Sequence, residues 1–260
     1  MTATVEYVYC VVPAASVLTG MPRGIDSAPV RSVARADIAA LVSAVNAEQY
    51  SGDTASERMG DPEWLAPRAV AHDAVVTWAA DRGAVVPFPM WVMFSDDITV
   101  SAMLDERHDE LRGVLNRVSG ARELCVRISA DRAALANAAE RMDDRLDELE
   151  RRATAAPPGQ AYLLRRKLAE LRKSASRDIA SRIADQAHST LSDRSRESVA
   201  RDRSASNEPG VLLDGAYLVA DEQYDSFRSA LTDLVAAYGP TGVSFDFTGP
   251  WPPYHFVRDH

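Results

Sequence analysis

The residues that could carry acid–base chemistry are scattered along the chain. His72 and Asp73 are adjacent, but on a predicted helix their side chains point about 100° apart and cannot serve one site together. We therefore interpret His72 as a half-exposed helical histidine. The acidic residues between 143 and 148 alternate with arginines at helical spacing, a pattern typical of ion pairs along a solvated helix face. The sequence predicts no catalytic site and indicates that the protein is not an enzyme.

Motifs for phosphate, metal or cofactor binding are missing from the sequence. It contains no GxxxxGK[ST], GxGxxG, HExxH or GxSxG pattern. The two cysteines, Cys10 and Cys125, are far apart and lie in predicted strands rather than in a CxxC pair. We expect no bound metal and no cofactor.

Arg165, Arg166 and Lys167 form a local basic cluster in an acidic chain. The protein has 29 basic and 38 acidic residues, a net charge of −9, whereas the stretch from 131 to 203 has 16 basic and 13 acidic residues. Such a cluster could dock an acidic partner helix or RNA. Tyr162 is the one aromatic residue of this stretch, so stacking platforms for RNA bases are lacking. We expect a protein partner here and no nucleic acid.

The C-terminal sequence FDFTGPWPPYHFV, residues 245–257, combines aromatic rings with three prolines. The prolines fix φ and predict an extended path after a strand. Along this path Trp251, Tyr254 and Phe256 are held at defined positions. Two interpretations remain open: the rings fold back over the core as a terminal clasp, or they form an aromatic patch that receives an apolar partner.

The N-terminal half predicts a sheet flanked by helices. Ile38, Leu41, Val42 and Val45 follow Asp37 at helical spacing and predict a capped surface helix. Two prolines interrupt the apolar run 84–94, which indicates an edge or bulged strand. The expected elements are strands at 5–12, about 30–33 and 84–94, and helices at 38–45, 65–80 and about 100–118, with a polar loop at 51–62.

The C-terminal half predicts a second sheet and a long helical hairpin. The alternating strand RELCVRI comes first, followed by a charged helix from 131 to about 153, a PPG turn, and a helix over about 164–191. After a predicted linker at 194–209 come a strand at 211–219, a helix at 222–238 and a strand at 243–247. This β-α-α-β-α-β order is typical of ferredoxin-like folds, with a fourth strand still unassigned.

These elements predict an α+β protein of two domains. We expect an N-terminal α+β domain at 1–119 and a ferredoxin-like C-terminal domain at 120–260. The second includes the charged helical hairpin at 131–203 and the aromatic tail at 249–257. The longest apolar runs are too short to cross a bilayer, and no signal peptide is evident, so we expect a cytoplasmic protein without a membrane partner.

Several segments together resemble the gas vesicle protein F/L family. They are EYVYCVVPA, VVPFPMWVMFSDD, GARELCVRIS, GQAYLLRRK, GAYLVADEQYDSF and TGPWPPYHFV, which occur in this order from Glu6 to Val257. TGPWPPYHFV is the most specific of them.

The resemblance implies an accessory protein for the assembly of gas vesicles, the gas-filled protein shells of some bacteria and archaea. It also implies association with the small hydrophobic shell protein and with other accessory proteins, in the cytoplasm or at the gas vesicle. A chaperone-like adaptor and a minor component of the shell both fit. The alternative is a ferredoxin-like RNA- or ligand-binding module without a gas vesicle role, and the F-like and L-like branches stay undistinguished.

Overall fold

The computed structural model describes residues 3–16, 19–50, 58, 60–131, 133–137, 144–201 and 210–257. The chain divides into two compact units, one formed by residues 1–123 and 250–260 and the other by residues 124–249. The C-terminal tail therefore groups with the first unit, whereas the sequence expectation assigned it to the second. No helix within the described ranges is long and apolar enough to span a membrane.

The first unit is built around an antiparallel sheet. Its strands follow the order β2-β3-β1-β4, and β5 also pairs with β1. Nearly all of β1 is buried, and its register against β3 shifts between Val8 and Cys10, which places a bulge at Tyr9. The strands are β1 (Thr4–Pro13), β2 (Arg31–Arg35), β3 (Ile38–Asn46), β4 (Val86–Pro87) and β5 (Met93–Phe94).

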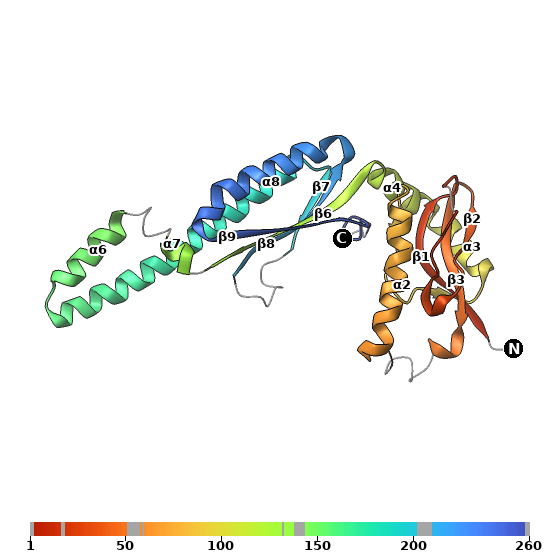
Figure 1. The fold of residues 1–260 in the computed structure, drawn as a ribbon, viewed down its shortest axis with the longest axis horizontal. Helices are drawn as coiled ribbons and strands as arrows, with labels where there is room; N and C mark the ends of the chain where they lie inside the picture. Colours follow the sequence, from red (N-terminus) through yellow and green to blue (C-terminus); the bar gives the residue numbers. More distant parts are fainter. Residues whose placement is uncertain are drawn as a thin grey trace. The chain divides into compact units, whose positions relative to one another are not determined.

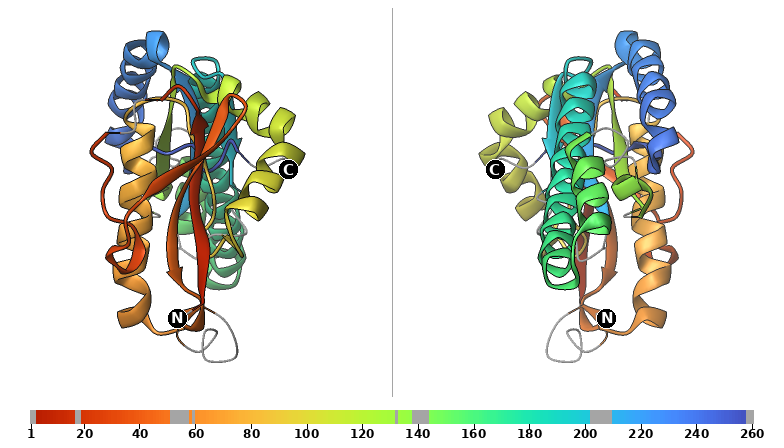
Figure 2. Two further views of the ribbon diagram at one scale, coloured as in Figure 1. Left: turned by 90° about the vertical axis from the view of Figure 1, so that its right-hand side faces the viewer. Right: turned by 90° about the vertical axis from the view of Figure 1, so that its left-hand side faces the viewer.

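Helices cover both faces of this sheet (Figure 2). The helix α2 packs Val75 and Val76 against buried residues of β1 and β3, while α3 and α4 contact the sheet from the other face. The start of α3 is fixed by a capping box between Asp96 and Thr99. The helices are α2 (Pro62–Ala80), α3 (Asp97–Glu106) and α4 (His108–Val118), with short 3-10 turns η1 (Ile25–Ser27) and η2 (Ala47–Gln49).

The second unit contains a four-stranded sheet in the order β7-β8-β6-β9. Leu124, Val126 and Ile128 alternate along β6 and form a core with Tyr217 of β8 and Phe227 of α8. Helix α8 and the C-terminal half of α7 lie along this sheet (Figure 1). The elements are β6 (Ala121–Ala130), β7 (Glu197–Ala200), β8 (Val211–Ala220), η3 (Asp221–Gln223), α8 (Tyr224–Tyr238), η4 (Gly239–Thr241) and β9 (Val243–Trp251).

A helical hairpin extends from the second unit (Figure 1). It consists of α6 (Asp144–Ala155) and the 35-residue α7 (Pro158–Ser192), joined at the predicted PPG turn. At 1.5 Å per residue, α7 is about 52 Å long. Leu146 and Leu149 of α6 pack with Leu168 of α7 in a small core separate from that of the sheet. Residues 138–143 of the predicted charged helix lie outside the described residues.

The predicted helix at 38–45 is wrong, because these residues form β3. β3 lies between β1 and β2, with helices on both faces, so almost every side chain in it is buried. A strand buried on both faces shows no alternation of apolar and polar residues. Its apolar residues then match helical spacing by coincidence.

Three further expectations are corrected by the structure. The predicted linker contains β7, which pairs antiparallel with β8 and supplies the missing fourth strand; its remainder at 202–209 lies outside the described residues. The single helix expected at 100–118 is divided at Arg107 into α3 and α4. The last strand does not end at Phe247, because β9 continues through Pro250 to Trp251.

Candidate functional site

The C-terminal tail of the first unit holds one exposed aromatic ring directly before two buried prolines. Trp251 is 45% exposed, whereas Pro252 and Pro253 directly after it are buried. Two turns follow, in which the N–H of Tyr254 donates to the carbonyl of Pro252 at 2.7 Å and the N–H of Phe256 donates to that of Pro253 at 3.1 Å. The indole is therefore presented by a segment whose path is fixed on its C-terminal side.

Tyr254 and Phe256 are part of the packing of the first unit. Phe256 is only 3% exposed, and its carbonyl accepts a hydrogen bond of 2.6 Å from Arg117 of α4. Tyr254 is partly buried against the core that contains Tyr7 and Val75. Tyr254 and Phe256 thus pack over the core of the first unit, as the clasp interpretation expects, and of the three rings only Trp251 is exposed.

His72 connects the tail to the sheet of the first unit. Its Nδ1 shares a 2.8 Å hydrogen bond with the hydroxyl of Tyr7, and its Nε2 lies 3.4 Å from the hydroxyl of Tyr254. The residue is 3% exposed, so the expected half-exposed histidine is wrong. Burial lowers the pKa of His72 to about 4 and raises the pKa of Tyr7 and Tyr254, which keeps all three groups neutral near pH 7.

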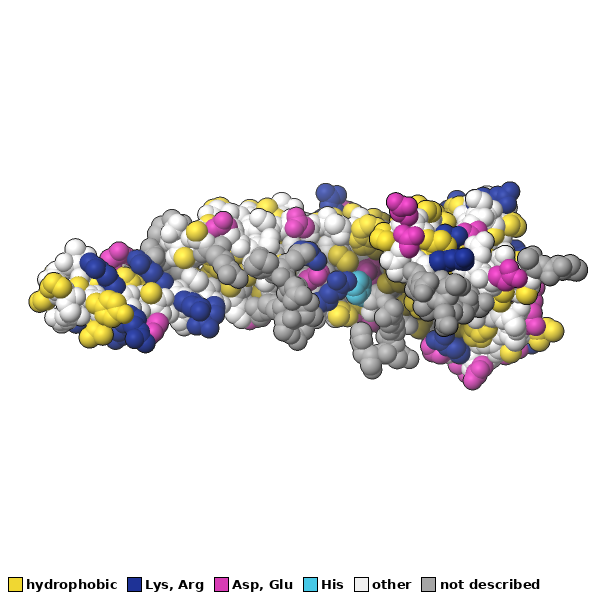
Figure 3. All heavy atoms as spheres, turned by 90° about the horizontal axis from the view of Figure 1, so that it is seen from below, with side chains coloured by type: hydrophobic (Ala, Val, Ile, Leu, Met, Phe, Trp, Pro, Cys, Tyr) yellow, Lys and Arg dark blue, Asp and Glu magenta, His cyan; other side chains and the backbone are white. Residues whose placement is uncertain are grey.

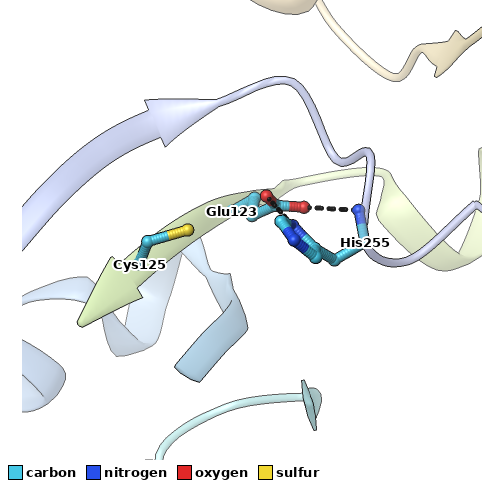
Figure 4. Close-up of side chains that lie close together, drawn as sticks. All are labelled: Glu123, Cys125 and His255. Atoms are coloured by element: carbon cyan, nitrogen blue, oxygen red, sulfur yellow. Dashed lines mark hydrogen bonds and ion pairs between the residues drawn. The ribbon is translucent and has the colours of Figure 1, made fainter. Parts of the chain in front are cut away.

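A second polar anchor joins the tail to the buried carboxylate of Glu123 (Figure 4). The backbone N–H of His255 donates to Oε2 at 3.0 Å, and its ring Nδ1 donates to Oε1 at 2.6 Å. Figure 4 also draws Cys125, which lies two residues further along β6 and belongs to the second unit. We assign the Glu123–His255 pair the role of a tail anchor.

The predicted basic cluster lies on the outer part of the hairpin. Arg165, Arg166 and Lys167 are all exposed residues of α7, in the half that pairs with α6. Lysine and arginine side chains lie beside hydrophobic ones on this part of the molecule, at the left end of the view in Figure 3. These three residues are consecutive in α7 of the second unit, whereas the tail residues belong to the first unit.

Two apolar residues beside the cluster escaped the sequence argument. Tyr162 is 66% exposed and Leu163 is 63% exposed, in the half of α7 where Leu164 and Leu168 face α6. In the sequence, apolar residues of the predicted helix recur every three or four residues from Leu164 onward. Tyr162 and Leu163 lie off that spacing, and this is the signal in the sequence that could have identified them as surface residues.

The first unit contains an open pocket of about 590 Å³. Its lining residues are Asn46, Glu48, Gln49, Arg58, Trp64 and Arg68. The donors of Arg68 are already engaged: it pairs with Asp26, donates to the hydroxyl of Tyr50 at 3.1 Å and to the carbonyl of Trp64 at 2.9 Å. Its guanidinium also stacks on Trp64, 4.0 Å from the ring centroid. These contacts serve local packing rather than a ligand.

Comparison with known proteins identifies relatives along the whole chain. The family model described as gas vesicle synthesis protein GvpL/GvpF matches residues 5–258. Gas vesicle protein L from Streptomyces sp. (strain CB03234) is 30% identical over 98% of this chain and 94% of its own length. Gas vesicle protein L2 from Halobacterium salinarum is 29% identical over 98% of this chain and 91% of its own. The crystal structure of GvpF from Anabaena sp. PCC7120 shares the fold, with a TM-score of 0.77, 17% identity and 99% coverage of both chains.

Proposed function

Because this chain belongs to the GvpL/GvpF family of gas vesicle synthesis proteins, we propose that it is an accessory protein of gas vesicle assembly. In this role it binds the small hydrophobic shell protein, other accessory proteins, or both, as a chaperone-like adaptor or a minor shell-associated component. It works in the cytoplasm and at the vesicle, and it catalyses no reaction.

The exposed indole of Trp251 is the observation that carries this proposal. A shell subunit with a large apolar surface aggregates before incorporation unless a partner covers that surface. Trp251 offers a large ring with few rotatable bonds, on a backbone fixed by two buried prolines. A ring held in place before binding loses little conformational entropy when a partner covers it. Tyr254 and Phe256 support this surface by anchoring the segment behind it.

We also propose that the second unit has a ferredoxin-like fold. The second unit has the element order β6-α7-β7-β8-α8-β9 and the sheet order β7-β8-β6-β9. A β-α-β-β-α-β unit of this kind supports assignment to the ferredoxin-like class, with α6 and the first half of α7 as an extension. Such folds serve many functions, so the assignment by itself adds no activity.

The test is gas vesicle formation in a host from which the gene for this chain has been deleted. Plasmids encoding wild type, Trp251→Ala, Trp251→Phe or Ile98→Ala are introduced, and vesicles are counted by electron microscopy. Ile98 is another exposed apolar residue of the first unit and is the matched control. We expect wild type, Trp251→Phe and Ile98→Ala to restore vesicles and Trp251→Ala to yield far fewer. Normal vesicles in the deletion strain would contradict the proposed function.

A further inference from the structure

The outer face of the α6/α7 hairpin exposes a compact group of apolar and cationic side chains. We call it the hairpin patch and define it as Tyr162, Leu163, Arg165, Arg166 and Lys167. Tyr162 and Leu163 are both more than 60% exposed, among the most exposed large apolar residues in the described part of the chain. All five residues lie within two turns of the N-terminal part of α7. The patch therefore lies entirely on one helix of the second unit.

Helix geometry separates this patch from the hairpin core. Leu164 and Leu168 of α7 face α6. At 100° per residue, Tyr162 points about 160° away from Leu164, and Arg166 lies only about 40° from Tyr162. Tyr162 and Arg166 are therefore neighbours on the outward face, one turn apart. The apolar residues of the patch make no contribution to the core that holds the hairpin together.

The patch is also positively charged in an acidic protein. From Ala161 to Lys173 the helix carries five basic residues and one acidic residue, while the whole chain has a net charge of −9. Arg166 reaches the one acid, Glu170, at 3.5 Å, and both side chains are 70% exposed. Arg165 and Lys167 form no ion pair within the described residues. Exposed cations of this kind attract a partner of opposite charge.

We propose that the hairpin patch docks an acidic amphipathic helix of another gas vesicle accessory protein. The partner's apolar stripe covers Tyr162 and Leu163, and its carboxylates pair with Arg165, Arg166 and Lys167. A helix fits because the side-chain ridges of α7 form grooves into which a second helix packs. A second copy of this patch does not fit, since two clusters of like charge repel each other. The inference rests on the proposed role in gas vesicle assembly.

The contact is identified by photo-crosslinking in cells that make gas vesicles. A photoreactive amino acid replaces Tyr162 in one strain and Val70, an exposed residue of α2, in a control strain. We expect position 162 to crosslink to an acidic segment with helical apolar spacing in another gas vesicle protein, and position 70 not to crosslink to that segment. Crosslinks from position 162 to RNA or to a second copy of this chain would overturn the proposal, as would the absence of any crosslink.

The chemistry of the contact is tested with a synthetic peptide that copies the crosslinked segment. Arg165→Glu/Lys167→Glu and Tyr162→Ala/Leu163→Ala are each expected to weaken peptide binding at least tenfold in fluorescence anisotropy. Arg177→Glu/Arg182→Glu changes the charge of the same helix equally, about 15 Å or more beyond Lys167, and is expected to bind within twofold of wild type. Equal weakening by both charge variants would refute a localised patch.

Failure of this inference is distinguishable from failure of the proposed function. All variants are first checked for folding by circular dichroism and for vesicle formation in the deletion host. If vesicles depend on the chain but the hairpin patch gives no crosslink, the patch proposal is refuted and the assembly role stands. If vesicles form without the chain, the assembly role itself is refuted.

Discussion

Adding a single methyl group at Gly24 should destabilise the first unit. A Cβ added at Gly24 would lie 2.0 Å from Tyr9 Oη and 2.8 Å from Ser43 Oγ. Its φ is −82°, which alanine adopts without strain, so the cost of Gly24→Ala is one of packing alone. Tyr9 is fully buried and cannot swing into solvent. To make room, its hydroxyl must move by more than 1 Å, roughly the gap to an ordinary van der Waals contact.

Two contributions set the magnitude of this effect. Overpacking a buried region costs about 1–3 kcal/mol. The hydroxyl of Tyr9 also accepts a hydrogen bond of 3.0 Å from the N–H of Ile25 and donates one of 3.1 Å to Ser43, and weakening both costs about 1 kcal/mol more. We therefore expect Gly24→Ala to lower the free energy of unfolding of the first unit by about 2–4 kcal/mol.

Tryptophan fluorescence during urea denaturation measures this change in one unit. Trp64, Trp78 and Trp91 lie within the first unit, and Trp251 is grouped with it at the end of β9, so the signal comes mainly from the first unit. Gly113→Ala is the control, because a Cβ added at this position meets no atom within 4 Å. The substitution also replaces a glycine inside α4 by a better helix former. It should be neutral or stabilise by up to about 1 kcal/mol. A Gly24→Ala protein within about 0.5 kcal/mol of wild type would refute the packing argument.

Three other changes follow from the same structure. The pKa of His72 is about 4 in the folded protein and about 6.5 in the unfolded chain, so the unfolded chain takes up the proton first as pH falls. The free energy of unfolding therefore decreases between about pH 6.5 and 4, by up to about 3 kcal/mol. Urea titrations should show the difference between wild type and His72→Gln shrinking over this range, and a constant difference would contradict the shifted pKa. Phe256→Ala should cost about 3–5 kcal/mol because the ring is buried, while Trp251→Ala should cost clearly less because its residue is 45% exposed. Similar losses by fluorescence would show that the two rings are equally packed. Leu168→Ala should speed amide hydrogen exchange in α6 and leave the sheet of the second unit protected, whereas uniform acceleration would mean that the hairpin is not a separate cooperative element.

The sequence predicted a helix or strand well where one face of that element is buried and the other is exposed to solvent. The spacing through Leu65 to Ala80 predicted α2 within a few residues of its bounds, and the PPG segment located the end of α6. α7 begins at Pro158, within that segment and before the predicted start at about 164. The prediction of a helix at 38–45 was wrong, because burial of β3 on both faces removes the alternation of apolar and polar residues that marks a strand. The short β7 was also missed, because its four residues are too few to show a period.

The candidate site was predictable in part for a similar reason. The prolines around Trp251 indicated a fixed path, but the sequence could not tell which rings of the tail face the core. That depends on partners distant in sequence: Arg117 for Phe256, and His72 for Tyr254. The same long-range contacts explain why His72 is buried and not half-exposed as the sequence predicted. Positions fixed by tertiary contacts leave no mark in the local pattern.

Co-purification of this chain with the small gas vesicle shell protein tests the central claim most directly. Tagged wild type, Trp251→Ala and Ile98→Ala are each produced with the shell protein, after circular dichroism has shown that all three are folded, and the captured shell protein is quantified. We expect wild type and Ile98→Ala to capture the shell protein and Trp251→Ala to lose most of this capture. Equal capture by all three proteins would place the contact elsewhere, and no capture by folded wild type would contradict direct binding of the shell protein.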